Sequence, residues 1–185
     1  MVTLSALWLP ILLSAVVVFI ASSIMHTLLT YHRRDIRQLP DEDKVLAALR
    51  VAGLQRGLYV FPYGSPKEMK SPAMAEKYKQ GPVGMMTVFP SGLPVMPKFL
   101  GMWFAFCLII SFFVAYLTGR TVPPGVPFLA AFRVAATAAF LAYGLGQLSN
   151  GIWKGQPWGA TLKEVFDGLI YGLLTGATFA YFWPH

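Results

Sequence analysis

Hydrophobic and polar positions along this chain form long blocks rather than short periods. Four apolar runs of about twenty residues or more cover 4–31, 99–118, 128–148 and 162–182. A helix rises about 1.5 Å per residue, so each run is long enough to cross a hydrocarbon core of about 30 Å. The pattern predicts an all-α polytopic membrane protein with four transmembrane helices, forming a single integral-membrane domain over residues 1–185.

The composition agrees with a membrane protein. Apolar residues make up 56% of the chain and charged residues only 12%, whereas a soluble domain has about 25% charged residues. The five tryptophans lie at or near the ends of the predicted spans, where an indole ring prefers the membrane interface. The single cysteine, Cys107, lies within an apolar run, so an intrachain disulfide is excluded.

Positive charge is concentrated between the first two spans. Eleven of the 15 lysines and arginines lie in residues 32–98. Because positively charged loops stay in the cytoplasm, we expect a cytoplasmic loop of about 65 residues there, and both termini on the outer, periplasmic side. The loop has no nucleic-acid fold signature, so the lipid bilayer and its anionic headgroups are the expected partners rather than nucleic acid.

The loop is expected to be partly ordered. Capping and charge patterns predict short helices over Asp41–Gly53 and over Ser71–Gly81. The remaining loop residues are rich in proline, glycine, methionine and aromatic side chains. They are too apolar for a free linker, so we expect them to pack on the membrane surface or against the spans.

Two of the three histidines lie where the first span ends. His26 and His32 are six residues apart, which on one straight helix separates them too far to bind one metal ion together. Asp35 lies three residues after His32, so it can accept from one ring nitrogen and leave the other for a proton or a metal. In the alternative interpretation these side chains are interfacial, and Asp35 balances a neighbouring arginine.

A row of small residues marks the last span. Gly168, Gly172 and Gly176 recur every four residues, and Ala180 continues the row. Such a row lets another helix backbone approach closely in lipid. The approaching helix can belong to the same chain or to another subunit. Because four spans offer few partners, we expect a homo-oligomer or a complex with another membrane protein.

Two charged residues lie inside predicted spans, where charge is costly. In one interpretation Arg133 reaches outward to headgroups and Asp167 pairs with Lys163 one turn earlier. In the other, the two spans form an intramembrane polar seam for protons or a small solute. Its residues would be Arg133, Thr137, Gly144 and Gln147 on one helix and Asp167, Tyr171, Thr175 and Thr178 on the other.

Motifs of common enzyme classes are absent. The chain has no glycine-rich phosphate loop followed by lysine, no Cys-x-x-Cys, and none of the histidine clusters that bind di-iron in membrane oxygenases. With one cysteine and few acidic residues in the spans, nucleophilic or paired-carboxylate catalysis has little material. The residues therefore favour a non-enzymatic protein and identify no cofactor.

The pattern SSxxHTLLxYHRxDxxxLPxED in residues 22–43, with GLYVFPY, KSPAMAEKYKQGPVG and KEVFDGLIYG further on, resembles a group of bacterial four-span membrane proteins. The resemblance covers nearly the whole chain. It implies a location in the bacterial inner membrane, and it brings no activity, cofactor or functional residue with it.

Three hypotheses of function remain. The first is an oligomer that acts as a small channel or as a membrane scaffold, based on the glycine row and the seam. The second is a metal- or cofactor-binding membrane protein, with redox activity as one form, that uses His26 and His32 together with loop methionines or a second subunit. The third is a lipid-handling protein whose apolar loop binds acyl chains.

Overall fold

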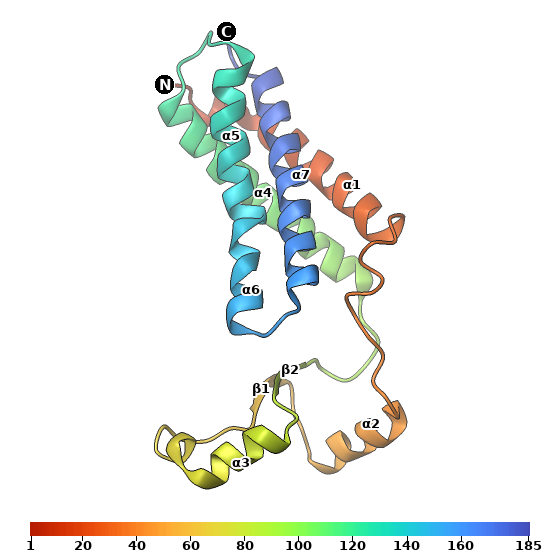
Figure 1. Ribbon diagram of the computed structural model, residues 1–185. Helices are drawn as coiled ribbons and strands as arrows, with labels where there is room; N and C mark the ends of the chain where they lie inside the picture. Colours follow the sequence, from red (N-terminus) through yellow and green to blue (C-terminus); the bar gives the residue numbers. More distant parts are fainter. The chain divides into compact units, whose positions relative to one another are not determined.

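The computed structural model describes residues 1–185 and is mostly helical (Figure 1). The chain divides into two compact units, one formed by residues 1–36 and 95–185 and the other by residues 37–94. The first unit contains four long helices and the short helical segments attached to them. These are η1 (Leu4–Leu7), α1 (Trp8–Thr27), α4 (Met96–Thr121), α5 (Phe128–Tyr143), η3 (Leu145–Gln147), α6 (Leu148–Trp153) and α7 (Trp158–Tyr181).

Three helical segments are long and apolar enough to cross a membrane: Leu4–Thr27, Met96–Thr121 and Phe128–Trp153. This agrees with the predicted membrane class. The helix of the first predicted span ends at Thr27 rather than at residue 31, because the chain turns there. The third segment is irregular at Gly144, where the backbone leaves α5 and makes one 3-10 turn before α6.

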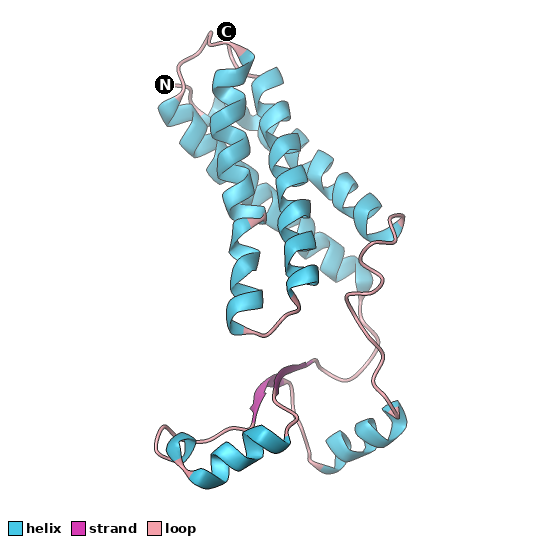
Figure 2. Ribbon diagram, in the orientation of Figure 1, coloured by secondary structure: helices cyan, strands magenta, loops and turns pink.

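The second unit combines helices with a small sheet (Figure 2). Both predicted short helices are confirmed, as α2 (Glu42–Val51) and α3 (Pro72–Gln80). Between them lie the strand β1 (Gly57–Phe61) and the 3-10 turn η2 (Glu68–Lys70), and after them the strand β2 (Gly84–Val88). The strands pair antiparallel. This sheet was not predicted from the sequence.

The glycine row of α7 packs against α5 of the same chain. A Cβ atom on Gly172 would lie 3.0 Å from the Phe140 backbone nitrogen, and one on Gly176 would lie 2.5 Å from the Ala136 Cβ. Ala180 is buried as well. The row therefore serves packing within the chain, and it no longer argues for a contact between subunits.

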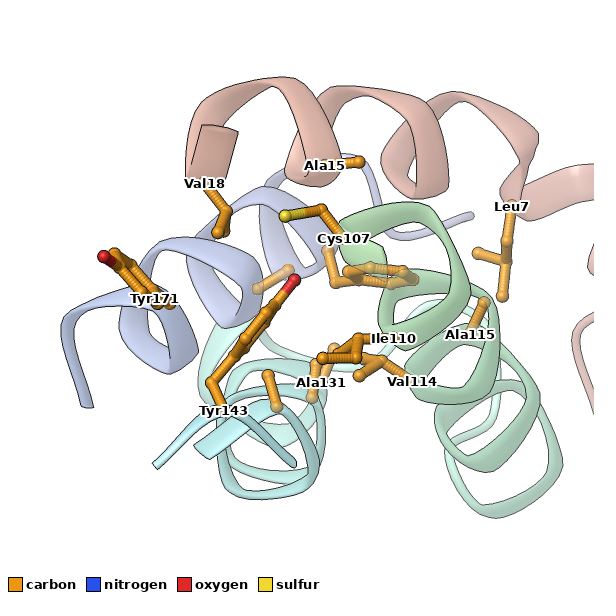
Figure 3. Close-up of a cluster of buried hydrophobic side chains, with 14 of the residues drawn as sticks. Leu7, Ala15, Val18, Cys107, Ile110, Val114, Ala115, Ala131, Tyr143 and Tyr171 are labelled. Carbon is orange, nitrogen blue, oxygen red and sulfur yellow. The ribbon is translucent and has the colours of Figure 1, made fainter. Parts of the chain in front are cut away.

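The core of the first unit lies among α1, α4, α5 and α7 (Figure 3). Its fully buried members include Leu7, Val18, Cys107 and Phe179. The two termini lie at one end of this unit (Figure 1). There the Val2 amide donates to the Gly119 carbonyl at 2.8 Å. The end of α1 and the beginning of α7 lie at the opposite end of the helices, and they carry the chemically distinctive residues described next.

Candidate metal centre

The end of α1 brings the two histidines together. After Thr27 the chain forms turns in which the Arg33 amide donates to the Thr30 carbonyl at 3.1 Å. This reversal places the His32 ring against the His26 ring, with 4.7 Å between the ring centroids and 13° between the ring planes. The helix break that one shared metal ion requires is therefore present in this chain.

His32 lies between two carboxylates. Its Nδ1 lies 2.7 Å from Asp35 Oδ2, and its Nε2 lies 2.8 Å from Asp167 Oδ2. All three side chains are largely removed from solvent, since 17% of His32, 17% of Asp35 and 5% of Asp167 is exposed. Charge-assisted hydrogen bonds at this depth hold the imidazole ring in one orientation.

Asp167 is held by both of its oxygens. The Tyr31 hydroxyl donates to Oδ1, while Oδ2 faces His32 and lies 3.8 Å from His26 Nε2. The residue that follows, Gly168, is at the close contact between α7 and α5. The carboxylate is therefore fixed both by its hydrogen bonds and by the helix that carries it.

Lys163, one helical turn before Asp167 on α7, binds the segment that follows α1. Its ammonium donates to Asp35 Oδ1 and to the Tyr31 carbonyl, each at 2.6 Å. The hydrogen bond from Lys163 lowers the pKa of the Asp35 carboxyl below its usual value, and the hydrogen bond with His32 lowers it further. Lys163 thus pairs with Asp35, whereas the sequence pattern suggested Asp167 as its partner.

The three groups that point to one centre are His26, His32 and Asp167, whose ligand atoms all lie within 4.8 Å of one another. Ligand atoms about 2.0–2.2 Å from one tetrahedral ion lie about 3.3–3.6 Å apart. The distances to Asp167 Oδ2, 2.8 Å from His32 Nε2 and 3.8 Å from His26 Nε2, lie on either side of this range. His26 is 52% exposed, which leaves one side of the centre open.

In each histidine, Nδ1 is hydrogen-bonded to an oxygen atom and Nε2 faces Asp167. His26 Nδ1 lies 3.0 Å from the Ser22 carbonyl oxygen, which only accepts, so Nδ1 carries the proton. His32 Nδ1 donates to Asp35 in the same way. Metal-binding histidines typically donate their second ring nitrogen to a carbonyl or carboxylate, which fixes the tautomer that binds metal.

A cavity of about 410 Å³ adjoins the centre. His26 and Asp167 line it, and so do Glu164 and Gln147. The Glu164 Oε2 atom is buried and has no hydrogen-bond partner. Sequence reasoning overlooked Glu164, Tyr31 and Lys163 as parts of this site. Glu164 could have been found from the spacing Glu164-x-x-Asp167, because that spacing places both carboxylates on one helix face.

The predicted polar seam is not brought together over its length. Arg133 and Thr137 are exposed on α5, whereas Tyr171 and Thr175 are buried on α7 and their hydroxyl oxygens lack hydrogen-bond partners. Thr178 donates to the Leu174 carbonyl of its own helix at 2.8 Å. Of the predicted seam residues, Gln147, Asp167 and Tyr171 line the cavity beside the centre.

Comparison with known protein families, curated proteins and solved structures finds no match for this chain.

Proposed function

We propose that this protein is an integral membrane protein that binds one divalent transition-metal ion through His26 Nε2, His32 Nε2 and Asp167. The observation that carries the proposal is the convergence of these three ligand atoms within 4.8 Å, with each histidine oriented by an oxygen acceptor on Nδ1. A metal ion held there would take the place of the hydrogen bond between His32 Nε2 and Asp167 Oδ2.

The donor set favours Zn²⁺ or Fe²⁺. Two imidazole nitrogens and one carboxylate oxygen with an open position are typical of catalytic zinc sites and of non-haem iron sites. One chain supplies all three ligands, so neither a second subunit nor the loop methionines are required.

We place the centre at the cytoplasmic face of a bacterial inner membrane. The end of the first unit that carries it also has Arg33, Arg34, Lys154 and Lys163, whereas Arg120 lies near the other end, and basic residues favour the cytoplasm. In this arrangement α7 is a fourth span and both termini are periplasmic. The 24 residues of α7 are sufficient to cross the bilayer.

Packing supports the membrane position of α7 despite its charges. Asp167 is buried, and its carboxylate is hydrogen-bonded by His32 and Tyr31. Lys163 and Glu164 lie within the first two turns of α7, where long charged side chains reach the interface. Lys163 and Asp167 are paired, and charged groups that are paired near a helix end are tolerated in membranes.

The test is elemental analysis of the detergent-purified protein after equilibration with Zn²⁺ or Fe²⁺ under anaerobic conditions. We expect about one ion per chain in the wild type, and strongly reduced content in His26→Ala and His32→Ala. His185→Ala changes the remaining histidine, which is exposed at the C-terminus, and should keep the metal. A wild type that retains no more metal than His32→Ala would overturn the proposal.

A further inference from the structure

The cavity beside the centre has a polar end and an apolar wall. His26, Glu164 and Asp167 form the polar end. The wall is formed by side chains from α4, α5 and α7, namely Met96, Leu100, Trp103, Tyr143 and Tyr171. Met96 and Leu100 are exposed, so they lie at the mouth. A cavity of this kind fits a molecule with a polar head and an apolar chain.

The wall is fixed in place by aromatic packing. The Trp103 ring lies 6.3 Å from the Tyr171 ring and 6.4 Å from the Tyr143 ring, measured between centroids. The Trp103 indole donates to Ser22 Oγ at 2.8 Å, which ties α4 to the end of α1 next to His26. The apolar wall is therefore connected directly to the helix end that carries His26.

Glu164 is the charged group at the polar end that is not used by the hydrogen-bond network. Its Oε2 atom is buried without a partner, and the neighbouring Lys163 ammonium is already bound to Asp35 and the Tyr31 carbonyl. A buried carboxylate oxygen without a donor is costly. The position therefore suits a group that supplies a proton donor, such as a reacting water molecule.

Building on the proposed metal site, we infer that this cavity takes the acyl ester of an amphipathic, membrane-resident molecule and hydrolyses it, with Glu164 as the general base. A carboxylate beside an open metal position is the arrangement that activates water for attack on a carbonyl. The apolar wall receives the acyl chain. The membrane supplies the substrate through the mouth at Met96 and Leu100.

The reaction is balanced with water as the only co-reactant. Glu164 accepts a proton from the attacking water as the water oxygen bonds to the carbonyl carbon, and a metal ion held by His26, His32 and Asp167 would polarise the carbonyl oxygen. The bond from the carbonyl carbon to the alcohol oxygen then breaks, and Glu164 returns the proton to that oxygen. One ester and one water give one carboxylic acid and one alcohol, without oxidation or reduction.

The first test measures binding. The probes are straight-chain acyl hydroxamates, which chelate metal ions through their head group, titrated into the zinc-loaded protein in detergent. While the chain lies within the cavity, each added methylene should tighten binding about threefold to fourfold, as burial of a CH₂ group predicts. Leu100→Trp fills the mouth with a bulkier side chain at an exposed position. It should abolish this chain-length dependence and leave the zinc content unchanged.

The second test measures hydrolysis of p-nitrophenyl acyl esters by the zinc-loaded protein. Glu164→Gln should keep one zinc ion and bind the hydroxamates, but should lower kcat by about 100-fold or more, as loss of a general base predicts. Glu76→Gln, which changes an exposed glutamate of α3, should retain wild-type kcat.

The outcomes separate this inference from the proposed metal site. If His32→Ala loses the metal but the zinc- and iron-loaded wild type neither hydrolyses the esters nor binds hydroxamates with a dependence on chain length, the inference is wrong and the metal site stands. If Glu164→Gln hydrolyses the esters as fast as the wild type, Glu164 is not the base. If the wild type binds no metal, the proposed function itself fails.

Discussion

Gly168 of α7 and Gly144 at the end of α5 meet backbone to backbone: a Cβ atom on Gly168 would lie 2.2 Å from the Gly144 Cα. No side chain fits between them, and the atoms in the way belong to the main chain, which cannot rotate aside. This contact at Gly168, the residue that follows Asp167, fixes the position of α7 along α5. The position of the candidate ligand thus depends on two glycines 24 positions apart.

Gly168→Ala should therefore separate the two helices. Overpacking of a tight contact costs about 1–3 kcal/mol, and here the displaced groups include Asp167. We expect a lower free energy of unfolding in detergent and a weaker affinity for Zn²⁺. Gly159→Ala is the matched control, because it lies on the same helix and an added Cβ there has nothing within 4 Å. Equal stability of the two variants would contradict this view of the contact.

Asp35→Asn should weaken metal binding without removing a ligand. Asp35 accepts from His32 Nδ1 at 2.7 Å and from Lys163 at 2.6 Å, so it orients the ring that presents Nε2. Loss of such an outer partner typically lowers metal affinity by about 10–100-fold. Asp43→Asn, at an exposed position in the first turn of α2, is the control. Isothermal titration with Zn²⁺ measures both, and an unchanged Kd in Asp35→Asn would contradict the orienting role.

Tyr31→Phe tests the support of the carboxylate. The Tyr31 hydroxyl donates to Asp167 Oδ1, and the ring packs against His32 with centroids 4.1 Å apart. Phenylalanine keeps the ring and removes only the hydrogen bond. We expect a Zn²⁺ affinity about tenfold weaker than in the wild type. Tyr63→Phe, at a tyrosine that is 83% exposed, should bind Zn²⁺ like the wild type.

Cysteine labelling in intact cells tests the proposed topology. In a Cys107→Ala background, Thr3→Cys and His185→Cys should react with a membrane-impermeant maleimide from the periplasmic side. Ser149→Cys should react only after the inner membrane is opened. All three positions are exposed, so differences report their side of the membrane. Protection of His185→Cys together with labelling of Thr3→Cys would mean that α7 does not span the bilayer.

The long helices were predictable because length and apolarity alone define them. The short helices of the second unit were predictable from their caps, such as Ser71, whose Oγ accepts from the Met74 amide. The sheet was overlooked because its strands lie within segments rich in proline and glycine, which the composition made look irregular. The local sequence of each strand does not reveal its partner, because β1 and β2 are more than twenty residues apart along the chain.

The candidate centre was only partly predictable, because some of its residues are also far apart along the chain. The pair of His32 and Asp35 follows from a spacing of three residues, and their contact at 2.7 Å needs only a turn. Asp167 lies 135 positions from His32 along the chain. Its approach depends on the end of α1 at Thr27 and on the close packing of α7 against α5. Both are properties of the folded chain rather than of any short pattern.

Removal of metal should lower stability by an amount that depends on the free metal concentration. An ion that binds only the folded protein stabilises it by RT ln(1 + [L]/Kd), or about 2.7 kcal/mol at 100 times Kd. Adding Zn²⁺ to chelator-treated protein should therefore raise Tm progressively. His32→Ala should show a flat response, because it lacks one of the three converging ligands, whereas His185→Ala should respond like the wild type. A Tm that rises equally in all three proteins would place the stabilising ion elsewhere in the molecule.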